Sequence, residues 1–168
     1  FTIACVQGVA LGGGAGLVAC SDPVIAEPGT KIALSEAKLG ISAAVIGPYV
    51  YKRLGSAGCR RLAMLASRVD ATEALRLGFV DEIAESHSSM EESVSSVLSE
   101  VMTSGPLAVS SAKRMVSVLD TWEGDGESLR SWTLDLTSEM RGSSEGQEGL
   151  SSFLEGRKPA WIEDDQEG

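Results

Sequence analysis

A glycine-rich segment between two strand-like sequences constrains the fold of this chain more than any other feature. Residues 2–6 (TIACV) are short, apolar and β-branched, and the run 12–16 (GGGAG) follows a few residues later. Small apolar residues complete a helix-like stretch to residue 20, and residues 22–26 (DPVIA) are strand-like again. The pattern predicts a strand, a glycine turn, a buried helix and a further strand. This order is typical of layered α/β folds.

The remaining sequence predicts one more strand and then mostly helices. Residues 31–34 resemble a strand, residues 70–73 (DATE) resemble a capping box for a helix that stops at Gly78, and residues 79–83 resemble a short return strand. After a polar hinge, apolar stripes at helical spacing predict four helices, followed by an acidic tail that we expect to be frayed. The chain therefore divides into parts 1–84 and 85–168.

Charge and hydropathy exclude two classes of partner. The 168 residues carry a net charge of −10, with 8 basic and 7 acidic residues in 1–84 and 6 basic and 17 acidic residues in 85–168. Nucleic-acid surfaces need clustered Lys and Arg, and the one dense basic stretch, 52–68, is interpreted as helix faces. The longest apolar run, 41–50, is interrupted by polar and helix-breaking residues, whereas a membrane span needs about 20 apolar residues.

The cysteines and the first residue bear on the chain's origin. Cys5, Cys20 and Cys59 have neither a disulfide nor a metal-site spacing, which predicts a reducing compartment such as the cytoplasm or the mitochondrial matrix and no bound metal. Because the chain starts at Phe1 and enters a strand directly, we expect that it begins partway into a larger gene product.

Several catalytic motifs are absent from the sequence. His87 is the single histidine and lies in a Ser-rich polar segment, so it is interpreted as a solvated loop residue rather than a catalytic base. Neither the phosphate-binding G-x-x-x-x-G-K-[ST] pattern nor the dinucleotide-binding G-x-G-x-x-G pattern occurs. The run 55–58 misses the spacing of a nucleophile elbow by one residue.

The glycine run and Glu36 remain as candidates for chemistry. Free N–H groups at a glycine-rich helix start can stabilise negative charge that develops on oxygen, although the same glycines could serve only close helix packing. Glu36 stands among small and apolar neighbours at the end of a strand-like run, where a carboxyl group can act as a general acid or base. An exposed turn residue beside Lys38 is the alternative interpretation of Glu36.

At this point the sequence resembles the enoyl-CoA hydratase/isomerase (crotonase) superfamily. The resemblance rests on three collinear motifs: TIACVQGVALGGGAGLVACSDPVIAEPGTKIALSEAKLGI, VDATEALRLGFVDEI and EGLSSFLEGRKPAW. It implies an α/β crotonase-type spiral of β-β-α units in 1–84 and a helical trimerisation region in 85–168. It further implies an acyl-CoA substrate, no cofactor beyond that coenzyme A, and an N-terminal part of the fold that lies outside this chain.

The resemblance also implies roles for individual residues. The backbone N–H of Gly13 becomes one oxyanion donor, and Glu36 becomes the second of the two glutamates that add water in the family's hydratases. The first glutamate falls on Gly16, so two-carboxylate hydration cannot operate as usual. Leu11 and Gly12 are expected to contact substrate.

Further positions implied by the resemblance concern specificity. Ala44 and Tyr49 are expected to shape the acyl pocket, and Arg157 and Lys158 to approach the phosphates of coenzyme A. A Gly also replaces the first glutamate in methylglutaconyl-CoA hydratases, which favours a hydratase of branched or dicarboxylic enoyl-CoA. A single-glutamate double-bond isomerase and a non-catalytic subunit of a larger assembly remain the alternatives.

Overall fold

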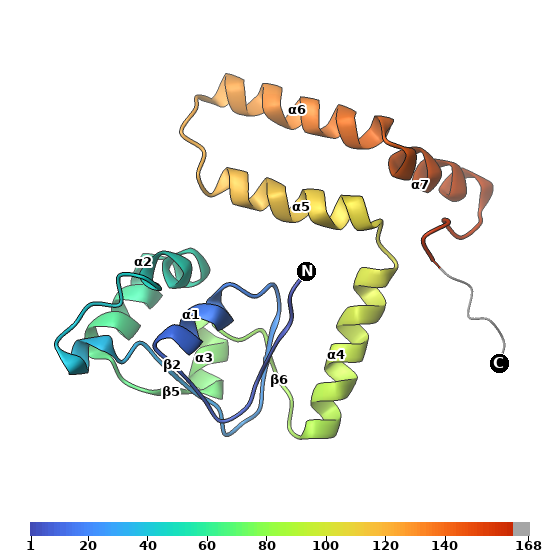
Figure 1. Cartoon of the computed structure of the whole chain (residues 1–168). Helices are drawn as coiled ribbons and strands as arrows, with labels where there is room; N and C mark the ends of the chain where they lie inside the picture. Colours follow the sequence, from blue (N-terminus) through green and yellow to red (C-terminus); the bar gives the residue numbers. More distant parts are fainter. Residues whose placement is uncertain (163–168) are drawn as a thin grey trace. The chain divides into compact units, whose positions relative to one another are not determined.

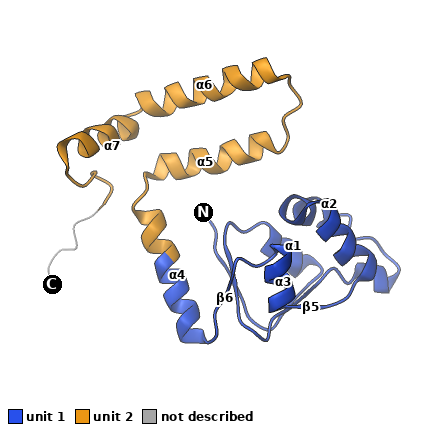
Figure 2. Cartoon of the chain, turned by 180° about the vertical axis from the view of Figure 1, so that it is seen from behind, with its two compact units in different colours: residues 1–96 blue, residues 97–168 orange. Residues whose placement is uncertain are grey.

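The chain divides into two compact units, which are described separately below. The computed structural model describes residues 1–162, and the units are Phe1–Ser96 and Val97–Gly168 (Figure 2). The division falls inside helix α4 (His87–Met102), whereas the sequence analysis placed its boundary at 84/85, just before that helix.

Unit 1 is built on two three-stranded sheets. In the first, β1 (Ala4–Val6), β3 (Val24–Ala26) and β6 (Glu82–Ile83) are parallel and lie in that order. In the second, β2 (Val9–Leu11) is parallel to β4 (Lys31–Ala33), which is antiparallel to β5 (Val69–Asp70). Strands β1 to β4 alternate between the sheets along the chain. The predicted α/β class is confirmed.

Short helices connect these strands (Figure 1). They are α1 (Gly13–Ala19), the 3₁₀ helix η1 (Glu36–Leu39), α2 (Gly47–Leu65) and α3 (Ala71–Leu77). The predicted caps of α3 are confirmed, because the Asp70 carboxylate accepts a hydrogen bond from the Glu73 N–H at 2.9 Å and Gly78 ends the helix with φ 78°. Helix α2 is interrupted at Gly55, whose φ of 67° and ψ of −178° are accessible only to glycine.

The core of unit 1 lies between the sheets and these helices. Its largest fully buried side chains come from β4 and the residue after it, from α2 and from the segment after α3: Ile32, Leu34, Leu62 and Phe79. Ile25 of β3 is buried in a second, smaller cluster with Ala84 and Met90. The buried Thr30 hydroxyl donates to the Val6 carbonyl oxygen at 2.8 Å, so the polar group that enters this core is satisfied. Burial on this scale gives the glycine loop and Glu36 a rigid support.

The structure differs from the sequence-based expectations at two strands and one arginine. Strands β2 and β5 were not predicted, because β2 lies between Gly8 and the glycine run and β5 directly precedes α3, so neither stood out from the turn or the helix cap beside it. Arg53 was interpreted as part of a helix face and lies in α2, but the sequence did not indicate its burial. Its side chain is only 11% exposed and donates hydrogen bonds to the carbonyl oxygens of Ser21 and Phe79 at 2.9 Å each and to Asp81 at 2.6 Å.

Unit 2 contains the end of α4 and three further helices. These are α5 (Pro106–Leu119), α6 (Gly126–Gly142) and α7 (Ser144–Glu155), so the four helices predicted after the hinge are confirmed. Helix α7 is capped by Ser143, whose hydroxyl accepts from the Gly146 N–H at 3.0 Å. Residues 163–168 of the predicted frayed tail lie outside the described residues.

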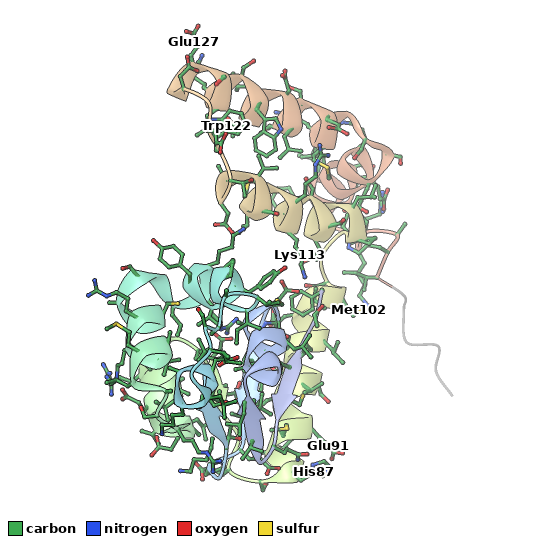
Figure 3. The ribbon with its side chains drawn as sticks, turned by 60° about the vertical axis from the view of Figure 1, so that its left-hand side comes forward. His87, Glu91, Met102, Lys113, Trp122 and Glu127 are labelled. Carbon is green, nitrogen blue, oxygen red and sulfur yellow. The ribbon has the colours of Figure 1, made fainter. Side chains whose placement is uncertain are left out.

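The predicted apolar stripes of α5 and α6 are not buried within the described chain. Neither helix has a buried residue, and large hydrophobic side chains of this unit are exposed, among them Leu107, Val116, Leu134, Phe153 and Leu154. Trp122 and Trp132 contact each other, with ring centroids 6.0 Å apart, and Figure 3 shows Trp122 at the turn between α5 and α6. An amphipathic helix with its apolar stripe exposed requires a partner surface.

Residues 1–162 contain neither a helix that could span a membrane nor a group of side chains that could bind a metal ion. Within 1–162, every helix is too short or too polar to cross a lipid bilayer. Over the same residues, His, Cys, Asp and Glu side chains form no group of three or more that could hold a metal ion.

Candidate active site

The glycine loop and Glu36 meet because their elements leave neighbouring parallel strands at the same edge. Leu11, the last residue of β2, is opposite Ala33, the last residue of β4. Gly12 directly follows β2, and Glu36 follows β4 after two residues. The carboxyl ends of parallel strands are where open α/β sheets place their ligands. Residues that are 24 positions apart in the sequence are therefore brought together at a position suited to binding.

Gly12 is the closest neighbour of Glu36 in this arrangement. Its N–H donates to the Ala33 carbonyl oxygen at 3.0 Å, and its backbone has φ 50° and ψ −119°. A Cβ atom on Gly12 would lie 3.3 Å from the Oε1 atom of Glu36. The absence of a side chain at this position therefore lets the carboxyl group pack directly against the loop backbone.

Glu36 is half-buried at the first position of η1, and its carboxyl group is only partly satisfied. Its Oε2 atom is buried without a hydrogen-bond partner, the only side-chain nitrogen or oxygen of residues 1–162 in that condition. Buried polar atoms are paired in the great majority of cases, and an exception requires an explanation. An open lone pair beside a glycine loop is suited to accept a proton from a bound molecule.

The glycines after Gly12 present an accessible backbone. Gly13 and Gly14 are exposed, and a Cβ atom on either would meet nothing within 4 Å. The Gly16 N–H is already engaged by the Gly12 carbonyl oxygen at 3.1 Å, whereas Gly13 is the first residue of α1. The first amides of a helix have no partner within the helix. The predicted oxyanion role of Gly13 is compatible with this geometry and stays a prediction.

The predicted specificity residues lie on the chain between η1 and the first turn of α2. Ala44 is exposed and Tyr49 is 51% exposed, while Leu11 is half-buried at the end of β2. Helix α2 contacts both η1 and α1, so this segment borders the loop that carries Glu36. Sequence analysis missed Ile46 in this segment, and only its contact with Gly16 in the folded chain reveals it. The pocket-shaping roles of Ala44 and Tyr49 stay predictions.

Arg157 belongs to unit 2, where it forms a local ion-pair network. Its guanidinium group donates to both carboxylate oxygens of Glu148, at 2.6 and 2.9 Å, and to Glu155 at 2.6 Å. These hydrogen bonds, the largest from Glu148, raise the pKa of Arg157, and Arg157 together with the Ala160 N–H lowers the pKa of Glu148 to about 2. A coenzyme A phosphate would have to compete with two carboxylates for Arg157. Phosphate binding by Arg157 and Lys158 stays a prediction.

His87 is exposed, as the sequence predicted, but it is the first residue of helix α4 and not a loop residue. Its side chain is 73% exposed at the start of α4, 3.6 Å from the Glu91 carboxylate, and Figure 3 shows both side chains together at that end of the helix. Its Nδ1 atom lies 3.4 Å from the amide of Gln7, which is itself exposed. Nothing in this arrangement resembles a nucleophile–base pair.

Comparisons with known proteins identify the family to which this chain belongs. The family model described as enoyl-CoA hydratase/isomerase matches residues 1–164. This chain therefore belongs to the enoyl-CoA hydratase/isomerase family, and the predicted superfamily is confirmed.

Individual relatives are similar over nearly the whole chain. A carnitinyl-CoA dehydratase from Salmonella typhi is 34% identical over 165 residues, covering 95% of this chain and 62% of the relative. A crystal structure of an enoyl-CoA hydratase/isomerase from Marinobacter aquaeolei matches with a TM-score of 0.86 and 36% identity, over 96% of this chain and 60% of that one. An enoyl-CoA hydratase from Shewanella pealeana matches with a TM-score of 0.87 and 36% identity, over 95% and 58%. The chain thus spans about 62% of the length of the curated relatives it matches.

Proposed function

We propose that this chain provides the glycine loop and the acid/base carboxylate of an enzyme that adds water to, or removes it from, an enoyl-CoA. The observation that carries the proposal is the buried, unpartnered Oε2 atom of Glu36 beside the loop at Gly12. Family membership supports the thioester as the substrate class. Relatives named carnitinyl-CoA dehydratase favour hydration or dehydration over other reactions of the family.

In the proposed mechanism Glu36 carries the proton. The thioester carbonyl oxygen accepts a hydrogen bond from the Gly13 N–H, which stabilises the enolate that forms when the Glu36 carboxylate removes the α-proton. In the dehydration direction, the same carboxyl group then passes that proton to the β-hydroxyl group, which leaves as water, and the C=C bond forms. Glu36 ends as a carboxylate, so neither a metal nor a redox cofactor takes part. We propose that a second oxyanion donor comes from residues outside these 168.

A decisive experiment replaces Glu36 by Gln in the full-length protein. The amide keeps the shape of the side chain but cannot accept the α-proton, so turnover should fall by at least about 10³-fold while binding of a non-reacting acyl-CoA changes little. Retention of most of the rate would contradict the assignment of Glu36. Equal losses of binding and turnover would indicate a structural role instead.

The acyl group can be identified with a panel of thioesters. The resemblance to methylglutaconyl-CoA hydratases predicts a branched or dicarboxylic acyl group, whereas the named relatives point to carnitinyl-CoA. We propose that the panel contain these two types of thioester beside a short straight-chain enoyl-CoA. Ala44 and Tyr49 are the first residues to substitute when the basis of the preference is mapped. Preference for the straight-chain substrate would contradict both expectations.

Two alternatives are distinguished by the same panel. A double-bond isomerase needs only one carboxylate, and Gly16 in place of the family's first glutamate favours that reaction. Migration of the double bond without uptake of solvent oxygen would identify it. The same glycine is compatible with a non-catalytic subunit, which would process none of the thioesters.

Oligomerisation is a separate proposal for unit 2. The exposed apolar side chains of α5, α6 and α7 support packing against further copies of the chain, and a trimer is the assembly that the resemblance implies. Light scattering of the full-length protein tests it. A monomer at all concentrations would contradict the proposal.

A further inference from the structure

Helix α1 makes an unusually close contact with the start of α2. A Cβ atom on Gly16, which is buried, would lie 2.6 Å from the Cγ2 atom and 2.9 Å from the Cβ atom of Ile46. Real Cβ atoms do not approach other carbons so closely, so the backbone of α1 packs directly on the Ile46 side chain. In this packing no side chain fits at position 16.

The neighbour of Glu36 lies just before α1. Gly12 is the N-cap residue of α1, with a non-helical φ of 50° and ψ of −119°, and its carbonyl oxygen accepts the Gly16 N–H at 3.1 Å. Gly12 lies against the Glu36 carboxyl group and Gly16 lies against Ile46. A second carboxylate at position 16, where the resemblance places the family's first glutamate, would therefore meet Ile46.

Ile46 is held in this position by its own surroundings. It is the N-cap residue of α2, and its carbonyl oxygen accepts the N–H groups of Tyr49 and Val50 at 3.1 Å each. Its side chain is half-buried and packs against the main hydrophobic core. Isoleucine is β-branched and therefore restricted at χ1, and the two close atoms include its Cβ, which no rotamer change can move away.

We propose that Ile46 determines that this site operates with one carboxylate. It fills the volume that a side chain at position 16 would need, so α1 cannot present a second acid from that position. This role deepens the proposed function and rests on it. The consequence is that water is not held between two carboxylates, and the proton carried by Glu36 is the one on which the reaction depends.

A double-mutant cycle on stability tests the steric part without any substrate. The variants are Gly16→Ala, Ile46→Ala and the combination, and Gly14→Ala is the matched control, since a Cβ atom on Gly14 would meet nothing within 4 Å. Alanine is the better helix former, so Gly14→Ala should leave the unfolding constant unchanged or lower it. Gly16→Ala should raise it by at least about tenfold, the range of an overpacked core.

The combination decides between coupling and independence. Ile46→Ala removes the Cγ2 atom, the closer contact at 2.6 Å, but keeps the Cβ atom at 2.9 Å, so Gly16→Ala should cost a few-fold less in the Ile46→Ala background than in the parent, and at least about tenfold less with Ile46→Gly. Additive effects, or a Gly16→Ala variant as stable as Gly14→Ala, would overturn the proposal. If Gly16→Ala fails to fold, the combination should fold, and its failure to do so would likewise overturn it.

A functional arm tests the choice of chemistry. In the full-length protein, Gly16→Glu with Ile46→Ala should hydrate a short straight-chain enoyl-CoA at least about tenfold faster than Gly16→Glu alone, because only the combination makes room for a second carboxylate. If the stability cycle shows coupling but the two Gly16→Glu variants hydrate the substrate at equal rates, the role of Ile46 in the reaction is contradicted. If the parent protein turns over no thioester, that result counts against the proposed function only, because the stability cycle uses no substrate.

Discussion

The Oε1 atom of Glu36 lies 3.3 Å from the point that a Cβ atom on Gly12 would occupy. Gly12 also has a φ of 50° with a ψ of −119°, a combination that side chains rarely tolerate. Backbone conformation and the neighbouring carboxyl group therefore restrict this position independently of each other.

A Gly12→Ala substitution should consequently affect both stability and the site. We expect a loss of about 1–3 kcal/mol in the free energy of unfolding, the usual cost of a strained backbone at a non-glycine residue. Chemical denaturation of the full-length protein measures it. Gly13→Ala is the control for stability, because its Cβ atom would meet nothing within 4 Å. Equal losses in the two variants would contradict the explanation.

Arg53 should be an important stabilising residue of unit 1. Replacement by Met leaves the carbonyl oxygens of Ser21 and Phe79 without this donor and the Asp81 carboxylate with only the Val24 N–H, and we expect a loss of about 2–4 kcal/mol. Arg61→Met is the comparison, since Arg61 pairs with Glu73 but is 46% exposed, and such pairs contribute about 0–1 kcal/mol. Thermal or urea unfolding measures the loss of stability in both variants, and similar losses would contradict the stabilising role of Arg53.

The Glu148–Arg157 pair should make stability depend on pH below 4.5. The pKa of Glu148 falls from its ordinary 4.5 to about 2, so the folded state binds this proton less readily than the unfolded state. The stabilisation is therefore complete above pH 4.5 and is lost as the pH falls through 2. Glu148→Gln should flatten this part of the unfolding profile, while Asp135→Asn, at an exposed position of α6, should leave it unchanged. An unaltered profile in Glu148→Gln would rule out the assignment.

Glu145 should fix the beginning of α5. Its two carboxylate oxygens accept the N–H groups of Leu107 and Ala108 at 2.9 and 2.8 Å, which are open donors of the first helical turn. We expect Glu145→Ala to cost about 0.5–2 kcal/mol, as for other helix caps, and to speed hydrogen exchange at both amides. Glu139→Ala, on the exposed side of α6, serves as the control. Unchanged exchange at these amides would show that the contact does not persist in solution.

Local patterns explain which parts of the fold were predictable. Asp70, Glu73 and Gly78 act within a single short helix, so their spacing in the sequence already contains the interaction. The glycine loop and the position of Glu36 after a strand were similarly visible. The contacts of Ile46 with Gly16 and of Arg53 with Asp81 join residues about thirty positions apart. Such contacts depend on how the helices pack against each other, and a short stretch of sequence does not show this packing.

The prediction of the sheets was also limited because a short strand is defined by its pairing with a strand distant in the sequence. Strand β2 consists of Val9, Ala10 and Leu11 between two glycines, and its pairing with β4 is what defines it. Yet this pairing is also what brings Gly12 to Glu36. The sequence could therefore indicate both site residues separately, with the resemblance to the family joining them, while the physical reason for their proximity needed the structure.

The anchoring of α2 on both sides of the break at Gly55 has a consequence for how this chain can change over evolutionary time. The residues before it carry Ile46 and Tyr49 at the candidate site, and those after it carry Leu62 into the core. Val50, before the break, is buried in the same core as Leu62, after it, so both pieces of α2 are anchored to one core. Substitutions that repack this core would therefore also shift the residues that border the candidate site, and descendants of this chain would have to change core packing and acyl preference together.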